Sequence, residues 1–327
     1  MSLPPLGFIT KSKRTRLQER IHDSCMQSIP SMRISALPQE PDLPKKIDLT
    51  ELWSHERVVK ALGFQFSGTH QLTGSCVGAG LGNCEFTLNA IEVIKDADRE
   101  KIVMPFWLFP YGISRMLLGD RGPGEGSLGS AAARAVKEYG TLNNADTDLP
   151  QPENTDGLIW GESTEMKWSD GTAIPKTFLD RAKPHLIRQT MQVNSAADIR
   201  RVIRTTMRPF TFACNKFISP NNARIRGTTD KVCVGEIDTD GGHQVTCLGQ
   251  WDHPELGPLY KFPNQWGLKT YPIDPSSGTG YAVWVVEKNV DLAIKNEDAE
   301  VIWFGDYDGE PSADPVIIDF YRNLYSW

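Results

Sequence analysis

The sequence predicts an α+β fold, in which helices come first along the chain and strands follow. Between residues 76 and 207, apolar residues recur at nearly helical spacing in several segments. From Pro209 onward, short runs rich in β-branched and aromatic residues alternate with turn residues. A mainly helical first half followed by a mainly β second half is typical of the α+β class.

Four helices are expected in the first part of the chain. They span Val77–Ile94, Pro105–Gly119, Ala131–Tyr139 and Ser195–Met207. The first combines Ala, Leu, Phe and Ile at nearly helical spacing, which predicts a buried helix that begins at Cys76. Ser127 or Ser130 can cap the third helix, and Gly140 ends it, because glycine readily adopts the backbone conformation that terminates helices.

Five strands are expected after Pro209. They span Phe210–Phe217, Lys231–Ile237, Gln244–Gln250, Leu259–Phe262 and Tyr281–Glu287. The chain therefore divides into an N-terminal arm (1–42), a helical lobe (43–190), a β-rich lobe (191–287) and an acidic, aromatic C-terminal extension (288–327). Within the helical lobe, residues 143–173 are rich in Asn, Asp, Pro and Gly, which predicts a surface excursion or an insertion.

Composition indicates a soluble globular protein. Its 327 residues, 39% of them hydrophobic, suffice for a core that needs no disulfides. The 35 basic and 41 acidic residues give a net charge of 35 − 41 = −6, which provides no global field for nucleic acid. No apolar run approaches the roughly 20 residues that span a membrane, and the polar start is not a secretory signal. Six scattered cysteines without a CxxC pair indicate a reducing compartment. We therefore expect a cytoplasmic protein, or a virion-associated one if it is phage-encoded.

A thiol, an imidazole and a carboxamide follow one another along the chain at Cys76, His243 and Asn264. Cys76 opens the expected buried helix, so the positive end of the helix dipole favours its thiolate. His243 begins an apolar strand, and its imidazolium can pair with that thiolate. Asn264 can accept the proton of the ring nitrogen that faces away from sulfur, and Trp266 can cover this hydrogen bond. The backbone N–H of Cys76 can donate to an oxyanion. This set of groups predicts nucleophilic acyl chemistry.

Motifs along most of the chain resemble those of papain-like cysteine peptidases, particularly the compact members in bacteria and bacteriophages. The similarity runs from about Leu43 to Glu287. The segments that carry it are Leu43-Pro44-x-x-Ile47-Asp48, Gln71-x-x-Gly74-Ser75-Cys76, Gly242-His243-Gln244-Val245, Asn264-Gln265-Trp266-Gly267 and Gly280-Tyr281. The resemblance implies a papain-like two-lobed fold, with a helical left lobe, a β-barrel-like right lobe and an active-site cleft between them.

The resemblance also implies an activity, which is hydrolysis of peptide bonds through a thioester acyl-enzyme, with a peptide or protein as substrate and neither cofactor nor metal. The implied roles are nucleophile for Cys76, base for His243, orienter of the imidazole for Asn264, oxyanion-hole side chain for Gln71 and supporting shield for Trp266. Gln71 lies five residues before the nucleophile, whereas the family places its glutamine six before, where His70 stands. The first 42 residues do not resemble the family's inhibitory pro-segment, so activation by removal of such a segment is not expected.

Two other functions fit the same residues. One is acyl transfer to an amine, or hydrolysis of peptidoglycan amide crosslinks, which would use the same thiol. The other is a structural module of a larger assembly such as a phage particle, with partners bound through the terminal arms. The glutamine spacing and the arms themselves motivate this second alternative. Asp238, Asp240 and His243 lack the further ligands of a calcium loop, so a polar turn is expected there instead of a metal site.

Overall fold

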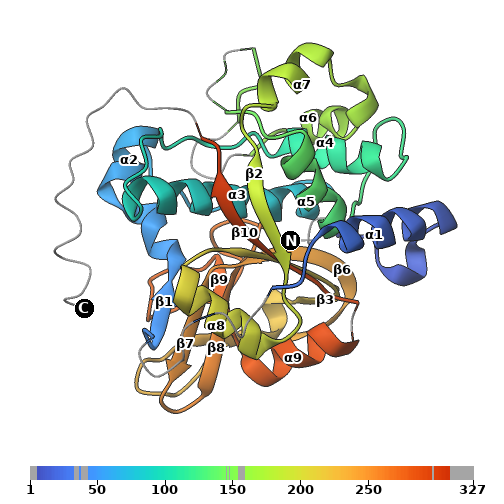
Figure 1. Ribbon diagram of the computed structural model, residues 1–327. Coiled ribbons are helices and arrows are strands. Elements are labelled where there is room, and N and C mark those ends of the chain that lie inside the picture. Colours follow the sequence, from blue (N-terminus) through green and yellow to red (C-terminus); the bar gives the residue numbers. More distant parts are fainter. Residues whose placement is uncertain are drawn as a thin grey trace.

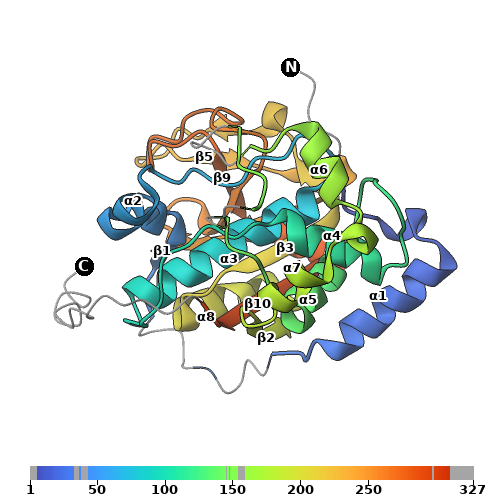
Figure 2. The same ribbon diagram turned by 90° about the horizontal axis from the view of Figure 1, so that it is seen from above.

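A helical part and a β-rich part pack against each other in this protein (Figure 1). The computed structural model describes residues 6–32, 37, 43–144, 146, 148–153, 159–296 and 298–309. Helices α2 to α7 gather on one side of the molecule, and most strands lie on the other side with helices α8 and α9. Seen from above, α3 runs through the middle of the molecule (Figure 2). The α+β class expected from the sequence is confirmed.

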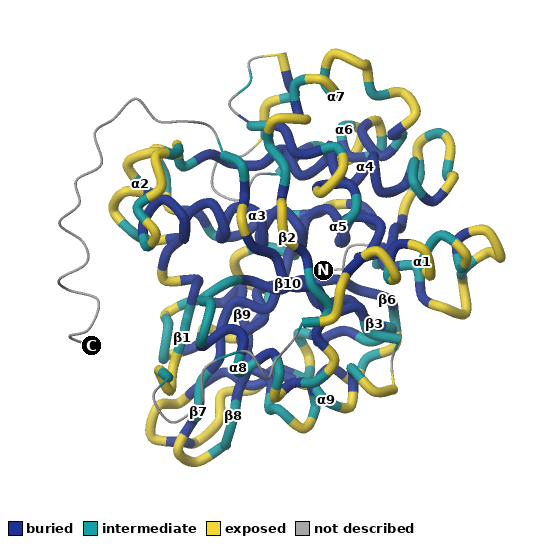
Figure 3. Tube along the Cα trace, viewed as in Figure 1, coloured by how far each residue is buried: buried dark blue, intermediate teal, exposed yellow. Residues whose placement is uncertain are grey.

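Helix α3 (Cys76–Ile94) is the central element of the helical part, and all of its residues are buried (Figure 3). Trp53, Phe66 and Trp107 belong to the apolar cluster around it. Because α3 is enclosed on every side, it has no polar stripe facing solvent. The other helices are α1 (Arg16–Ser28), α2 (Glu56–Leu62), α4 (Leu108–Leu117), α5 (Gly129–Glu138), α6 (Glu162–Trp168), α7 (Lys176–Ala182), α8 (Ala196–Thr206) and α9 (Glu287–Asn296). Among the described residues, no helix combines the length and the apolar character needed to cross a membrane.

The strands form two open sheets. One has the order β1-β7-β8-β9-β5-β4, with strands Lys46–Asp48, Gly249–His253, Gly257–Pro263, Ala282–Val286, Cys233–Gly235 and Arg224–Ile225. The other has the order β2-β10-β3-β6, with strands Ile187–Gln192, Glu300–Tyr307, Phe210–Ile218 and Ile237–Cys247. Within the described residues the end strands of neither sheet pair with each other. The β-rich lobe is therefore built from open sheets and not from a closed barrel.

Strand β6 carries His243 and pairs with β3 along most of its length, with His243 opposite Cys214. A bulge between Cys214 and Lys216 shifts the register, after which Asp240 lies opposite Lys216. The segment 238–241, expected to be a polar turn, thus continues the strand. The neighbouring strand β3 provides the backbone partners that a free turn would lack.

Strand β10 lies inside its sheet, between β2 and β3. Trp303 pairs with Met191 on one side and with Phe210 on the other. The segment 288–309 belongs to the expected C-terminal extension, yet α9 and β10 are integral to the fold. The rest of the extension, from residue 310 onward, lies outside the described residues.

The segment 143–173, expected to be a surface excursion, contains a packed helix. Trp168 at the end of α6 lies edge-on to Phe106, with ring centroids 4.7 Å apart. Phe178 in α7 packs against the same indole at 5.4 Å. The excursion therefore returns to the core of the helical part, which matters for the site described below.

Gly140 ends α5 with a left-handed backbone (φ +83°), and a Cβ there would lie 2.0 Å from the carbonyl oxygen of Ala182. Gly63, which ends α2, has a similar φ of +78° but open space around it. Gly63→Ala should therefore cost about 1 kcal/mol of unfolding free energy from backbone strain alone. Gly140→Ala should cost about 3 kcal/mol or more, since the backbone must also move. Urea unfolding of both variants measures the difference, and equal losses would contradict the close approach at Gly140.

Candidate active site

Cys76 is the first residue of α3, and its side chain is completely buried. Its Sγ atom accepts a hydrogen bond from the backbone N–H of Gln244, at 3.4 Å. Burial raises the pKa of the Cys76 thiol to about 11, and this shift is opposed by backbone N–H groups of Gln244, Gly7, Phe8 and Val77. In this conformation the sulfur is therefore a protonated thiol at neutral pH.

His243 and Asn264 form a hydrogen bond between Nε2 and Oδ1, at 3.1 Å. Because the amide oxygen can only accept, Nε2 carries the proton. Asn264 is held in turn by its Nδ2 donating to the Tyr271 hydroxyl at 2.7 Å and by its Oδ1 accepting the N–H of Gln265 at 2.7 Å. The Nδ1 atom of His243 is buried and has no hydrogen-bond partner among the described residues. Burial lowers the pKa of His243 to about 4, so the imidazole is neutral here.

Trp266 covers the imidazole. Its ring stacks on His243 with centroids 4.7 Å apart and planes inclined by 25°. Phe217 meets the same indole edge-on at 5.4 Å. The hydrogen bond between His243 and Asn264 is thus shielded from water, which strengthens it.

Contacts between α3 and β6 bring the thiol and the imidazole to one region. The side chain of Gln244 donates from Nε2 to the carbonyl oxygen of Val77 at 2.9 Å. Two residues along the strand, the Thr246 hydroxyl donates to the carbonyl oxygen of Gly80 at 2.6 Å. Since Gln244 follows His243 directly, these bonds fix the register of the imidazole relative to the head of α3.

Gln71 lies in the same region, fully buried. Its backbone N–H donates to the carbonyl oxygen of Gln265 at 2.9 Å, so the loop before α3 is joined to the asparagine turn. Its side-chain Nε2 donates to the carbonyl oxygen of Thr73 at 2.9 Å. The structure therefore places all five sequence-predicted residues in one neighbourhood, with the Gln71 carboxamide directed toward its own loop.

The N-terminal segment 6–10 crosses this neighbourhood between the two parts of the molecule. Ser127 of the helical part pairs with it in parallel, donating its N–H to Gly7 O at 2.8 Å and accepting the N–H of Ile9 at 2.9 Å. On the other side, the N–H of Phe8 donates to Gly242 O of β6 at 3.2 Å. The segment therefore bridges the helical part and the strand that carries the imidazole.

The same segment packs closely against the loop that leads to the thiol. A Cβ on Gly7 would lie 1.7 Å from the carbonyl oxygen of Gly74, two residues before Cys76. Phe8 is only 3% exposed and packs in the apolar cluster that contains Cys76. No sequence pattern predicts that segment 6–10 covers the region of Cys76, because these few residues acquire their partners only through the fold.

A buried arginine anchors the segment just after it crosses the site. The side chain of Arg14 is 1% exposed, and its Nη2 lies 2.8 Å from Asp298 and 3.3 Å from Glu300. Its Nε donates to the carbonyl oxygen of Ile9 at 3.2 Å. The covering segment is thereby tied to the end of the chain that forms β10.

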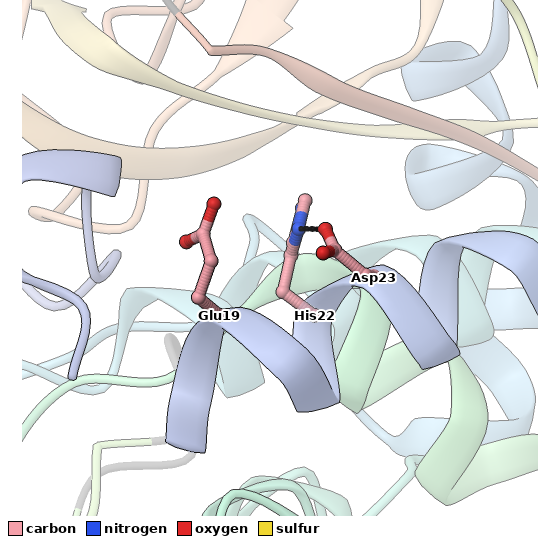
Figure 4. Close-up of side chains that lie close together, drawn as sticks. All are labelled: Glu19, His22 and Asp23. Atoms are coloured by element: carbon pink, nitrogen blue, oxygen red, sulfur yellow. Dashed lines mark hydrogen bonds and ion pairs between the residues drawn. The ribbon is translucent and has the colours of Figure 1, made fainter. Parts of the chain in front are cut away.

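Helix α1 adds further ionic contacts beside Arg14 (Figure 4). Glu19, His22 and Asp23 lie on adjoining positions of α1, with His22 Nδ1 3.3 Å from Asp23 Oδ1. His22 Nε2 lies 3.3 Å from Glu300, and Arg14 lies 3.7 Å from Glu19. Burial opposes the charged imidazolium, but the hydrogen bond and the charge of Glu300 leave the pKa of His22 raised. The three ligand-type side chains are thus engaged with protein groups and hold α1 in place.

Two carboxylates near Cys76 were not predicted from the sequence. Glu165 in α6 and Glu125 in the glycine-rich loop accept hydrogen bonds from the loop that precedes Cys76. Neither residue lies within a recognisable motif, and each meets the loop only after folding. The sole local signal is the placement of Glu125 between two glycines, which marks a loop and not a partner.

No protein-family model matches the chain, and no curated protein sequence matches it either. Solved structures of cysteine proteases are nevertheless similar. Xylellain, a cysteine protease from Xylella fastidiosa, gives a TM-score of 0.54 at 18% identity, covering 93% of this chain and 98% of that one. Procathepsin B S9 from Trypanosoma congolense gives a TM-score of 0.51 at 14% identity over 91% of each chain. The protein therefore has the two-lobed α+β fold of the papain-like cysteine proteases.

Proposed function

We propose that the protein is a cysteine peptidase in which Cys76 is the nucleophile, His243 the base and Asn264 the residue that orients the imidazole. The observation that carries this proposal is the hydrogen bonding of the two ring nitrogens of His243. Nε2 is tied to Asn264, while Nδ1 is a buried acceptor without a partner among the described residues, on the strand whose next N–H contacts Sγ. An imidazole held in this way can take a proton only at Nδ1.

The proposed reaction follows from these groups. Proton transfer from Cys76 to His243 gives a thiolate, which attacks the carbonyl carbon of a peptide bond. His243 then donates the proton to the leaving amine, and a thioester to Cys76 remains. Water deprotonated by His243 hydrolyses the thioester and restores both groups. The backbone N–H of Cys76, at the head of α3, and the carboxamide of Gln71 would stabilise the oxyanion in both steps.

The conformation described above is a closed one. With Cys76 buried and the pKa values of thiol and imidazole displaced in opposite directions by burial, both groups are neutral. A substrate needs the space that segment 6–10 fills. The peptidase is therefore proposed to act after this segment has moved, and the fold itself needs no change.

Labelling of the thiol tests the proposal. The Gly7→Ala chain, whose added methyl group cannot fit beside Gly74 O, is treated with an epoxysuccinyl peptide, and the adduct is mapped by mass spectrometry. We expect a single adduct at Cys76 and a parallel loss of peptide hydrolysis. The other five cysteines are also buried and serve as internal controls. Adducts spread evenly over the cysteines, or hydrolysis that survives Cys76→Ser, would refute the assignment.

A further inference from the structure

One buried carboxylate holds most of the loop that precedes the thiol. Glu165, in α6, accepts the backbone N–H groups of Leu72 at 2.9 Å and of Thr73 at 3.0 Å. It also accepts the hydroxyl groups of Thr73 at 2.7 Å and of Ser75 at 2.8 Å. The side chain has no exposed surface. Four donors from three loop residues therefore converge on a single group.

The helix that presents Glu165 is itself fixed. The Arg115 Nε donates to the carbonyl oxygen of Ser169, directly after α6, at 3.0 Å. The hydroxyl group of Ser169 accepts the N–H of Gly124 at 2.9 Å. Together with the packing of Trp168 on Phe106, these bonds attach α6 to the helical part independently of the loop. Glu165 can therefore act as a fixed point for the loop.

The remaining loop residue, Gly74, is held by residues other than Glu165. Its N–H donates to Glu125 at 2.9 Å, and its carbonyl oxygen accepts the hydroxyl group of Tyr111 at 3.0 Å. Glu125 is exposed, whereas Glu165 is buried. A hydrogen bond in water is easily exchanged for one to solvent, but a buried one is not. Of the two carboxylates, Glu165 thus exerts the stronger constraint.

All four hydrogen bonds are accepted by the Glu165 carboxyl group, which is the pattern of an ionised carboxylate. Burial holds the pKa of this carboxyl group above its ordinary value, and the bonds from Thr73, Ser75 and Leu72 offset only part of that shift. No ion pair joins Glu165 within the described part of the chain, so these donors alone compensate the buried charge. Only an ionised carboxylate offers about four acceptor sites, whereas an amide oxygen offers two.

We infer that Glu165 is a positioning residue for catalysis, which sets the place of the oxyanion donors at the head of α3. This inference rests on the proposed peptidase function. The loop runs from Gln71 to Cys76, and these two residues supply the proposed donors. Loss of the carboxylate would let the loop relax and move the donors away from the developing negative charge. Such a shift weakens binding of the transition state and leaves binding of the substrate nearly unchanged.

The test compares two reactions of the same thiol in the Gly7→Ala chain. Peptide hydrolysis forms an oxyanion, but alkylation by iodoacetamide displaces iodide at a saturated carbon and forms none. For Glu165→Gln we expect kcat to fall by about 30-fold with KM within about 2-fold. The alkylation rate should stay within about 2-fold. A defect of general folding would lower both rates together.

Three controls separate positioning from stability. Glu162→Gln makes the same change at an exposed position of α6 and should leave kcat unchanged. Thr73→Val removes one hydroxyl donor, and its effect on kcat should be much smaller in the Glu165→Gln chain than alone, because both changes act on one network. Thermal unfolding of each variant shows whether the fold persists at the assay temperature.

Amide hydrogen exchange gives a readout that needs no activity. In the full chain, Glu165→Gln should speed exchange in a peptide covering residues 72–75 by about 10-fold or more, and Glu162→Gln should not. Unchanged kcat, or unchanged exchange in this loop, would overturn the inference. A parent chain that hydrolyses no peptide would instead contradict the proposed function, and exchange alone would then decide whether Glu165 positions the loop.

Discussion

Deletion of residues 1–10 is expected to raise the rate at which iodoacetamide alkylates Cys76 at pH 7 by about 100-fold. The segment contributes to the burial of the thiol, and burial raises the pKa of Cys76 to about 11 against the opposing backbone N–H groups of Gly7 and Phe8. Each unit of pKa above the working pH lowers the thiolate fraction tenfold, so a return of two units multiplies this fraction by about 100. Mass mapping of the carbamidomethyl adduct measures the rate at Cys76 alone.

The pH dependence of the alkylation rate shows in which direction the segment shifts the pKa of the Cys76 thiol. In the full chain the alkylation rate should keep rising with pH up to about 11, because the thiolate forms only there. Without the segment the midpoint should move to lower pH, since water and the imidazole then reach the sulfur. Gly7→Ala should reproduce the shift without a deletion, whereas Gly227→Ala, at an unobstructed glycine, should not. Equal profiles for all chains would show that the segment does not control the thiol.

Replacement of His243 by alanine should lower kcat/KM for peptide hydrolysis by about 1,000-fold in the Gly7→Ala background. In the proposed mechanism the imidazole is the base for the thiol and the acid for the leaving amine. A side chain in such a role contributes about 100- to 10,000-fold to the reaction rate. Asn264→Ala removes the partner of Nε2 but leaves the imidazole in place, so a smaller loss of about 10-fold is expected. Steady-state kinetics with a fluorogenic peptide measures both.

A second buried histidine provides the matched control for this experiment. His253 is 2% exposed, lies in the other sheet and accepts the backbone N–H of Glu255 at 3.1 Å. His253→Ala therefore removes a buried imidazole without touching the site. Similar losses of kcat/KM in the two histidine variants would mean that His243 acts through stability and not through proton transfer.

The elements that the sequence predicts best are those with an unbroken apolar pattern. Helix α3 was expected from Cys76 onward, and β3 and β9 were expected within a residue or two of their ends. Strands β2 and β10 were missed for different reasons. Strand β2 has only six residues, and its two buried positions, Ile187 and Thr190, are three residues apart and do not alternate. Strand β10 has a strong apolar run, but its position far along the chain hides its place between β2 and β3.

The site divides in the same way. The sequence predicts Cys76, His243 and Asn264 as candidates because each proposed role demands a particular functional group, and Trp266 follows from its place beside the asparagine. Glu165 could not be found, because a carboxylate that accepts loop N–H groups has no local sequence pattern. The covering segment escaped notice for a related reason. The hydrogen bonds that place it across the site go to Ser127 and Gly242, more than 100 positions away, and no periodicity reports such pairings.

The tie between Arg14 and Glu300 also sets an order of events during synthesis. These partners are 286 positions apart, so the arginine leaves the ribosome long before its acceptor exists. At 5 to 20 residues per second the interval is about 15 to 60 s. Strand β10, which carries Glu300, must also insert between two strands made earlier. Anchoring of the covering segment by Arg14 is therefore a late step of biogenesis, and a nascent chain lacks the Glu300 contact until nearly all of the described sequence has been translated.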